Sequence, residues 1–287
     1  MAPQIRAAVA GPGTAGEIDW LSHGRAFEIG FHGDPHAVTA VARETAGSTR
    51  CDVNAVPAER RRKRLLVADM DSTIIGCECL DELADMAGLK PRIAAITERA
   101  MRGKIDFDSA LRERVAMLKG LPLAALERTY RERVRLNPGA TALVATMKAH
   151  GAHTMLVSGG FTWFTGRVAA DAGFDDTQAN MLEDDGAALT GTVREPILGR
   201  EAKLAALEAE AARLGIDCAD ALCVGDGAND LDMIRRAGLG VAWHAKPIVA
   251  EAAAARIDHG DLRALLYLQG YRDDEIMETS HPSTRSG

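Results

Sequence analysis

The chain has 287 residues and a formal net charge of −7 at pH 7, with 47% hydrophobic and 26% charged residues. This composition is ordinary for a folded soluble protein, and the length allows one large domain plus a small one. The negative charge argues against a nucleic-acid-binding surface over the whole protein, and no apolar run approaches the roughly 18 residues of a membrane-spanning helix. The N-terminal apolar run Ala7 to Ala10 is too short for a secretory signal, and the odd number of cysteines, five, favours a reducing cytoplasmic setting.

The first part of the chain is expected to form a small unit of its own. Phe27 to Phe31 alternates as a strand does, Asp34-Pro35 begins a predicted helix that ends at Ala46, and Cys51 to Val56 predicts a second strand. This strand–helix–strand pattern resembles the amino-acid-binding ACT-type modules, although it is too short for a complete one. Two interpretations stay open: a module that regulates the chain or joins two copies as a homodimer, and a remnant that only packs against the core.

A basic linker and a buried strand follow. Pro57 to Arg64 has five basic residues in eight and predicts a solvated linker. Leu65 to Ala68 is a short apolar run typical of a buried parallel strand, and it ends at Asp69. Asp71 and Thr73 come next at alternate positions. In open α/β sheets ligands bind beyond the carboxyl ends of the strands, so these polar groups stand where chemistry is expected.

Between Leu80 and His150 strand signals vanish, and apolar residues recur at three- and four-residue spacing. The last predicted helix of this stretch covers Ala140 to His150. The pattern predicts a helical cap inserted into the sheet domain at about residues 78–150. Further along, Met181 to Ile197 predicts a β-hairpin with Asp184-Asp185-Gly186 as its turn.

Polar groups also follow two later strand candidates. Thr154 to Val157 ends in Ser158-Gly159-Gly160, and Ala221 to Val224 ends in the loop GDGAND, residues 225–230. Lys203 opens a predicted helix that ends at Leu214, between these two strands. Asp226 to Ala237 predicts a further helix and Gly240 to Trp243 a fourth short strand, and the charged tail from Arg272 is expected to be frayed.

These four segments share the order and the strand-end placement of the four motifs of the haloacid-dehalogenase-like phosphatases. The stretch Asp-Met-Asp-Ser-Thr-Ile, residues 69–74, resembles in particular the nucleophile motif of the phosphoserine phosphatases among them. The resemblance covers about residues 65–271. It implies an α/β fold with a Rossmann-like parallel sheet core, an inserted helical C1-type cap and a small N-terminal α+β domain. The expected domains are residues 1–60, a catalytic domain over 61–275 and a flexible tail over 276–287.

The resemblance also implies the catalytic roles. Asp69 is expected to be the nucleophile that forms an aspartyl-phosphate, and Asp71 the acid and base that serves the leaving and attacking oxygens. Mg²⁺ is the expected cofactor, held by Asp69, the Asp71 carbonyl and Asp226. Lys203 is expected to neutralise phosphate charge and to hold Asp69. Two carboxylates beside a third would be left unpaired without a metal, which favours catalysis over simple turn formation.

Further residues are assigned to the substrate by the same resemblance. The expected phosphate-binding groups are Ser158, Gly159 and Asn229, while Asp230 and Thr73 are expected to support the residues around the metal. Glu78 at the entry to the cap can pair with an ammonium, and Arg114 can bind a carboxylate in bidentate fashion. Phe107 and Arg114 are seven residues apart and hence on one helix face. Together these charges suit phosphoserine, a zwitterion that also carries a phosphate.

The predicted function is therefore hydrolysis of O-phospho-L-serine, the last step of serine biosynthesis. One alternative keeps the phosphoenzyme but transfers the phosphate to another alcohol such as homoserine. A second alternative, of another class, is an amino-acid-sensing or scaffold protein with a retired phosphatase core. That alternative is disfavoured because Asp69, Asp71, Lys203 and Asp226 are all present.

Overall fold

The computed structural model describes residues 1–11, 14–101 and 104–278. Its centre is a six-stranded sheet in the order β10-β9-β8-β3-β4-β5, in which every neighbouring pair is parallel. The strands are β3 (Leu65–Ala68), β4 (His153–Phe161), β5 (Asp176–Asn180), β8 (Ala221–Gly225), β9 (Leu239–Trp243) and β10 (Ala255–Ile257). Because β3 lies between β4 and β8, the carboxyl ends of the three motif-bearing strands meet at one edge. The predicted α/β class with a parallel sheet is confirmed.

Both faces of the sheet are buried, as the apolar composition of the strands requires. Leu66 and Ala68 of β3 pack on one side and Leu65 and Val67 on the other, all fully buried. The first face is covered by α7 (Ala140–Ala149), α8 (Thr162–Ala172) and α12 (Ala264–Leu268). The second face is covered by α9 (Arg200–Leu214), α10 (Leu231–Arg236) and α11 (Pro247–Ala252). The four residues of β3 thus tie the two layers together.

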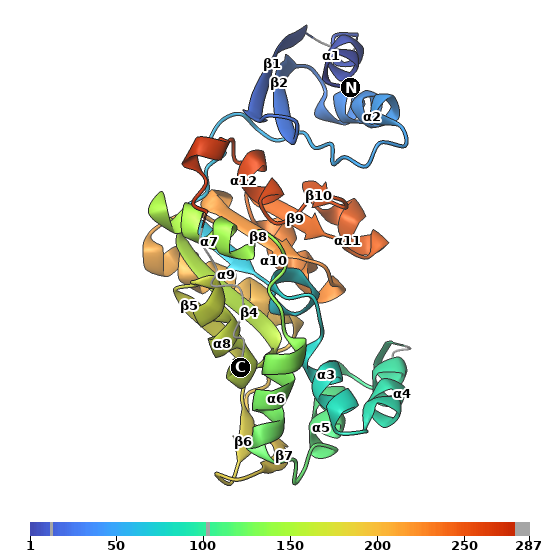
Figure 1. Cartoon of the computed structure of the whole chain (residues 1–287), viewed down its shortest axis with the longest axis vertical. Helices are drawn as coiled ribbons and strands as arrows, with labels where there is room; N and C mark the ends of the chain where they lie inside the picture. The colour runs from blue at the N-terminus through green and yellow to red at the C-terminus, as the bar shows by residue number, and fades with distance from the viewer. Residues whose placement is uncertain (12–13, 102–103, 279–287) are drawn as a thin grey trace.

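A group of helices projects from this core between β3 and β4 (Figure 1). It consists of α3 (Cys79–Met86), α4 (Lys90–Met101), α5 (Phe107–Ala116) and α6 (Leu123–Arg133). The helix α7 belongs elsewhere, because it contacts β4 and α8 of the sheet domain. The predicted cap over 78–150 is therefore too long at its C-terminal end. The high apolar content of α7 reflects packing on the sheet, which helical periodicity alone does not distinguish from packing in a cap.

The predicted hairpin is present and packs against this cap. It consists of β6 (Leu182–Asp184) and β7 (Leu189–Val193), and Asp185 accepts hydrogen bonds from two backbone amides in the turn. Gly120 N donates to Leu189 O at 2.8 Å, and Leu189 N donates to Leu121 O at 2.9 Å. The hairpin thus joins the cap to the chain that leaves β5.

The N-terminal module differs from the prediction. Its order is α1 (Ala2–Val9), β1 (Thr14–Ser22), β2 (Ala26–His32) and α2 (Pro35–Ala46), with β1 and β2 antiparallel. The predicted strand over Phe27–Phe31 and the helix begun by Asp34-Pro35 are present, whereas α1 and β1 were not predicted. Cys51 to Val56 forms no strand. Its polar side chains pair with the core instead: Asn54 exchanges two hydrogen bonds with the backbone of Arg256, each 2.9 Å long.

Most of the basic segment over residues 57–64 is exposed, as predicted for a solvated linker, but several of its side chains are also bound to the core. Arg60 pairs with Asp220 at 2.6 Å and Arg62 with Glu275 at 2.7 Å. Lys63 is 9% exposed and donates to two backbone carbonyls at 2.9 Å. Figure 1 shows the module and the cap at opposite ends of the sheet domain.

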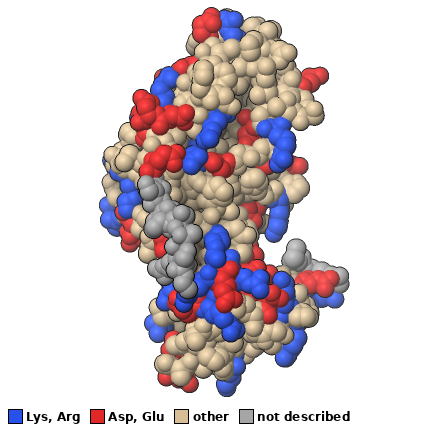
Figure 2. All heavy atoms as spheres, viewed as in Figure 1, with Lys and Arg blue, Asp and Glu red and all other residues tan. Residues whose placement is uncertain are grey.

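The end of the described chain is also packed. Residues 273–275 form a short 3-10 turn, Ile276 is buried, and Met277 N donates to Thr146 Oγ1 at 2.9 Å. The prediction of a frayed tail from Arg272 is therefore wrong up to residue 278, and residues 279–287 of the expected tail lie outside the described residues. None of the described helices has the length and apolarity needed to cross a membrane. Figure 2 shows acidic and basic side chains mixed over one face of the molecule.

Candidate active site

Asp69 lies at the carboxyl end of β3, where Lys203 and Asp230 reach it from two other segments. Lys203 Nζ is 2.6 Å from Asp69 Oδ1 and 2.5 Å from Asp230 Oδ1. All three side chains are almost entirely buried. Asp230 can come this close because residue 225 is glycine: a Cβ there would lie 2.3 Å from Asp230 Cγ. A lysine from α9 is thus fixed between two carboxylates from neighbouring strand ends.

In the turn after Asp69, η1 (Met70–Ile74), Asp71 is hydrogen-bonded to Ser158 and Thr73 to Asp226. Asp71 has extended backbone angles and Ser72 the left-handed angles φ 56° and ψ 0°. Such a conformation is uncommon for a residue other than glycine, and it is often found at functional sites. Ser72 Oγ donates to Glu78 Oε1 at 2.7 Å, so the turn is tied to the entry of the cap.

The Asp71 carboxylate contacts the irregular C-terminal part of β4. Ser158 Oγ donates to Asp71 Oδ2 at 3.1 Å, and Cys79 N donates to Oδ1 at 2.8 Å. A Cβ on Gly160 would lie 2.9 Å from Asp71 Oδ2, so this approach also needs a glycine. Burial, and secondarily the charge of Glu78, raises the pKa of Asp71 to about 6, against these two hydrogen bonds. Asp71 therefore exchanges a proton near neutral pH more readily than an exposed aspartate.

Asp226 completes a group of three carboxylates with Asp69 and Asp230. One oxygen from each lies within 4.8 Å of the others. Burial, and then the Asp230 charge, raises the pKa of Asp226, and the hydrogen bond from Thr73 Oγ1 at 3.2 Å opposes the shift. Asp230 is committed to Lys203 and to Gly227 N. Asp69 and Asp226 are therefore the carboxylates with room for a cation, and oxygen ligands suit a hard divalent ion.

Protonation of the central group follows from its charges. Burial and the charge of Asp230 raise the pKa of Asp69 well above its usual value, while the Lys203 ammonium opposes this shift. Burial alone would lower the pKa of Lys203, but Asp69 and Asp230 raise it, so the lysine stays charged. A bound cation would act in the same sense as Lys203 and favour ionised Asp69.

The cap brings its predicted residues to the same edge of the sheet. The Phe107 ring lies near the C-terminal end of β4, with its Cζ 3.6 Å from where a Cβ of Gly159 would stand. Burial lowers the pKa of the Arg114 guanidinium, and the nearby charges of Asp81 and Glu78 oppose that shift. Glu78 is exposed and Arg114 half-buried. An acid and a base thus lie close together on the cap.

Asn229 stands somewhat apart from the other predicted residues. It lies in the turn Ala228–Asp230, beside Gly227, and is half-buried. Within the described parts of the chain, no hydrogen bond ties its side chain to the carboxylates. Its predicted contact with a phosphate remains a prediction.

Asn180 at the end of β5 is a residue that the sequence did not single out. It is 2% exposed, and its Nδ2 donates to Gly159 O at 2.9 Å. Its Oδ1 accepts from Leu198 N at 2.7 Å. Asn180 thus fixes the C-terminal end of β4, at Gly159, to the segment that leads into α9. A lone asparagine in the polar segment DTQAN gives no signal that would have predicted this.

Comparisons with known proteins agree with this arrangement. The family model of the haloacid dehalogenase-like hydrolases matches residues 66–235. A phosphoserine phosphatase of Polaromonas sp. is 50% identical over 210 residues, which are 71% of this chain and 89% of that protein. A solved HAD family hydrolase of Salmonella enterica serovar Typhi is 32% identical, with a TM-score of 0.83 over 93% of this chain and 92% of that one. A substrate-bound phosphoserine phosphatase is 38% identical, with a TM-score of 0.66 over 71% of this chain and 97% of that one.

Proposed function

Because the chain belongs to the haloacid dehalogenase-like hydrolase family, and within it to the phosphoserine phosphatases, we propose that it hydrolyses O-phospho-L-serine to L-serine and phosphate. The observation that carries the proposal is that two aspartates lie close together at the end of one strand but have different electrostatic surroundings. Asp69 forms an ion pair with Lys203, whereas Asp71 has a raised pKa and accepts a hydrogen bond from Ser158. Two carboxylates with separate environments suit a nucleophile and a proton donor.

In the first step Asp69 attacks phosphorus. Its Oδ1 is engaged by Lys203 and by Met70 N, and no described residue donates a hydrogen bond to Oδ2. Oδ2 is therefore the oxygen that forms the bond to phosphorus as the ester P–O bond breaks, which gives an aspartyl-phosphate. The Lys203 ammonium, fixed by Asp230, offsets the negative charge of the incoming phosphate.

Asp71 handles the protons of both steps. In its protonated form it donates a proton to the departing seryl oxygen, and L-serine leaves as the neutral alcohol. The resulting carboxylate then accepts a proton from a water molecule whose oxygen attacks phosphorus. The bond to Asp69 breaks, inorganic phosphate is released, and both aspartates return to their starting states. A pKa near 6 suits both directions of transfer.

Mg²⁺ is the proposed cofactor, with the Asp69 and Asp226 carboxylates and the Asp71 backbone carbonyl as its protein ligands. The donor set supports this assignment, because all its atoms are oxygens, the ligands that Mg²⁺ prefers. The negative charge of the three carboxylates of Asp69, Asp226 and Asp230 also exceeds the single positive charge of the nearby Lys203. When bound, the ion supplies positive charge that lets an anionic nucleophile approach an anionic phosphate.

The substrate is proposed to be held by groups of the sheet domain and by groups of the cap. Ser158, Gly159 and Asn229 are proposed to bind the phosphate, Glu78 the ammonium and Arg114 the carboxylate. The ring of Phe107, 41% exposed, lies beside Gly159 at the edge of this site. Esters such as phosphocholine lack the carboxylate that Arg114 would bind, so we expect them to be poorer substrates.

The acceptor in the second step is proposed to be water. Transfer to homoserine would use the same base, but the Polaromonas relative and the substrate-bound structure are both named phosphoserine phosphatases. All five cysteines are free thiols, which supports a role in the reducing cytoplasm.

The test measures phosphate release from L-phosphoserine with and without Mg²⁺, beside phosphocholine, and with Asp69→Asn as the inactive control. We expect release that depends on Mg²⁺, favours L-phosphoserine and is absent in the variant. Equal release from both esters would refute the role of Arg114, because phosphocholine lacks only the carboxylate and keeps a cationic group that Glu78 can pair with. No release from either ester, with phosphate recovered on added homoserine, would replace hydrolysis by transfer.

A further inference from the structure

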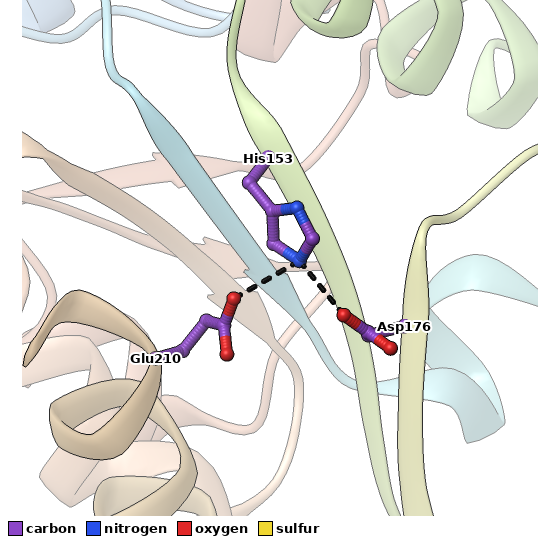
Figure 3. Close-up of side chains that lie close together, drawn as sticks. All are labelled: His153, Asp176 and Glu210. Atoms are coloured by element: carbon purple, nitrogen blue, oxygen red, sulfur yellow. Dashed lines mark hydrogen bonds and ion pairs between the residues drawn. The ribbon is translucent and has the colours of Figure 1, made fainter. Parts of the chain in front are cut away.

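A second cluster of metal-ligating side chains lies at the opposite end of the strands from Asp69. His153 begins β4, Asp176 begins β5, and Glu210 faces them from α9 (Figure 3). His153 Nε2 is 3.0 Å from Glu210 Oε1 and 3.1 Å from Asp176 Oδ2. Glu210 is 8% exposed, whereas the Asp176 side chain is 56% exposed and leaves the cluster open to solvent. The catalytic residues at the carboxyl ends of the strands take no part in it.

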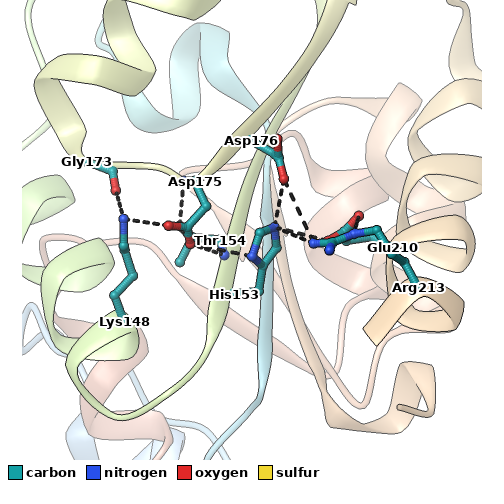
Figure 4. A network of polar contacts seen from close by, with 8 residues as sticks. All are labelled: Lys148, His153, Thr154, Gly173, Asp175, Asp176, Glu210 and Arg213. Atoms are coloured by element: carbon teal, nitrogen blue, oxygen red, sulfur yellow. Dashed lines mark hydrogen bonds and ion pairs between the residues drawn. The ribbon is translucent and has the colours of Figure 1, made fainter. Parts of the chain in front are cut away.

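The other side of the imidazole ring faces a carboxylate that is itself held in place (Figure 4). His153 Nδ1 lies 3.7 Å from Asp175 Oδ2, and that oxygen accepts hydrogen bonds from both Thr154 N and Thr154 Oγ1. Lys148 Nζ lies 2.6 Å from Asp175 Oδ1. A metal ion bound at Nε2 requires the tautomer with the proton on Nδ1, where that proton would face the Asp175 carboxylate, and metal-binding histidines commonly have such a partner.

In that tautomer three acceptor atoms converge on one point. Nε2, Glu210 Oε1 and Asp176 Oδ2 all present lone pairs, and a cation between them would relieve their repulsion. In this structure the Arg213 guanidinium supplies the positive charge. Its Nη2 donates a hydrogen bond to Glu210 Oε1 and lies 3.3 Å from His153 Nε2 and 3.9 Å from Asp176 Oδ2. The Arg213 side chain is 55% exposed, so it can turn into solvent without opening the core.

We propose that His153, Asp176 and Glu210 form a binding site for a divalent transition-metal ion of the Zn²⁺ class, with Arg213 as a built-in competitor. One imidazole nitrogen with two carboxylate oxygens suits Zn²⁺, and water would complete the coordination. Ligands about 2.1 Å from a tetrahedral ion stand roughly 3.4 Å apart. The two separations from Nε2 are only slightly shorter than this, so small side-chain shifts suffice.

The inference does not depend on the proposed function, because no catalytic residue belongs to this cluster. Its connection to the active site is α9, which carries both Glu210 and Lys203, two helical turns apart. An ion at the cluster would hold α9 to the first residues of β4 and β5. Its direct effect is therefore expected on thermal stability.

The test is calorimetric titration of the full chain with Zn²⁺ in the presence of saturating Mg²⁺, which occupies the oxygen ligands of the catalytic edge. The variants are His153→Gln, Asp176→Asn and Arg213→Gln, with Arg236→Gln as the control for loss of one positive charge. Arg236 lies on α10 and pairs with Glu208, away from the cluster. Unfolding without Zn²⁺ checks that each variant is folded, and the exposed Asp176 keeps the test informative if His153→Gln does not fold.

We expect one Zn²⁺ site in the wild type, weakened about tenfold or more by His153→Gln and by Asp176→Asn. Arg213→Gln should bind Zn²⁺ several-fold more tightly than the wild type, and Arg236→Gln should not. The wild type should gain thermal stability from Zn²⁺, and Asp176→Asn should not. Equal titrations of the wild type and the two ligand variants, or equal effects of Arg213→Gln and Arg236→Gln, would mean that the cluster is an ion-pair network only.

Discussion

At the scale of single residues, Asp71 links catalysis to stability. Its pKa is about 6 in the folded chain, above the value of about 3.9 expected in the unfolded chain. A raised carboxyl pKa stabilises the fold at low pH, and that contribution is lost as the pH rises through 6. Asp71→Asn should therefore stabilise the metal-free protein relative to the wild type, and the difference should grow by about 1 kcal/mol between pH 5 and pH 8.

Urea denaturation of both proteins in EDTA at the two pH values measures this difference. The same variant should have lost phosphate release, because an amide does not donate and accept the proton as the acid does. A stability difference that is constant with pH would show that Asp71 is not the titrating group. Asn keeps the size and the acceptor oxygen, so the hydrogen bond from Cys79 N can persist.

Arg114 permits a matched comparison on one helix. Arg112, two residues earlier on α5, is exposed and pairs with Glu195 at 2.7 Å. If Arg114 binds the substrate carboxylate, Arg114→Gln should raise the KM for L-phosphoserine at least tenfold, because one charged hydrogen-bonding partner is lost. Arg112→Gln should leave it nearly unchanged. Steady-state kinetics on both variants decide the question, and an equal rise in KM would assign the effect to the helix rather than to Arg114.

The central carboxylates and the lysine were predictable from the sequence because strand-end placement brings them together. Asp69 and Asp226 follow short apolar runs, and parallel strands align their carboxyl ends. Lys203 was predicted to open its helix, whereas α9 begins three residues earlier, at Arg200. Asn180 was not predictable, since its role depends on two backbone groups, Gly159 O and Leu198 N, that meet only in the fold.

At the scale of secondary-structure elements, the segment from Cys51 to Val56 shows why a strand prediction fails. The segment is extended, yet its contacts to the core use side chains in place of a strand ladder. Asp52 accepts hydrogen bonds from the backbone N–H groups of residues 258, 259 and 260. The prediction failed in the opposite sense at β5, which is a strand that was not predicted. Its sequence DTQAN has almost no apolar residues, because β5 is an edge strand of the sheet. Periodicity reports burial, and neither segment has the burial of a central strand.

Asp52→Ala should therefore destabilise the protein by about 2 kcal/mol, since it leaves several backbone N–H groups of one loop without their acceptor. Asp185→Ala is the matched control. Asp185 also accepts two backbone N–H bonds, but in an exposed turn where water can replace it. Its loss should cost clearly less stability than the loss of Asp52. Chemical denaturation of both variants measures the difference, and equal losses would show that Asp52 acts only as a local turn residue.

At the scale of the whole molecule, the N-terminal module has its own small core and polar contacts to the rest. Its buried residues form a cluster separate from those on the two faces of the sheet. Arg61 pairs with Glu28 at 2.7 Å, and Arg272 donates to Asp19 and to Trp20 O. Ion pairs on a surface contribute little net stability, so the module is expected to be held mainly by its covalent connection.

This organisation predicts that the place of a truncation matters more than its length. A chain that lacks residues 1–48 keeps Asp52 and Asn54 on the core, so it should fold and unfold within about 1 kcal/mol of the full chain. A chain that lacks residues 1–60 also loses those contacts and the Arg60–Asp220 pair, and it should lose about 3 kcal/mol more. Thermal and urea unfolding of the two chains test this. If both behave alike, residues 51–60 are only a tether. If the shorter deletion already unfolds the protein, the sheet domain depends on the module for its stability.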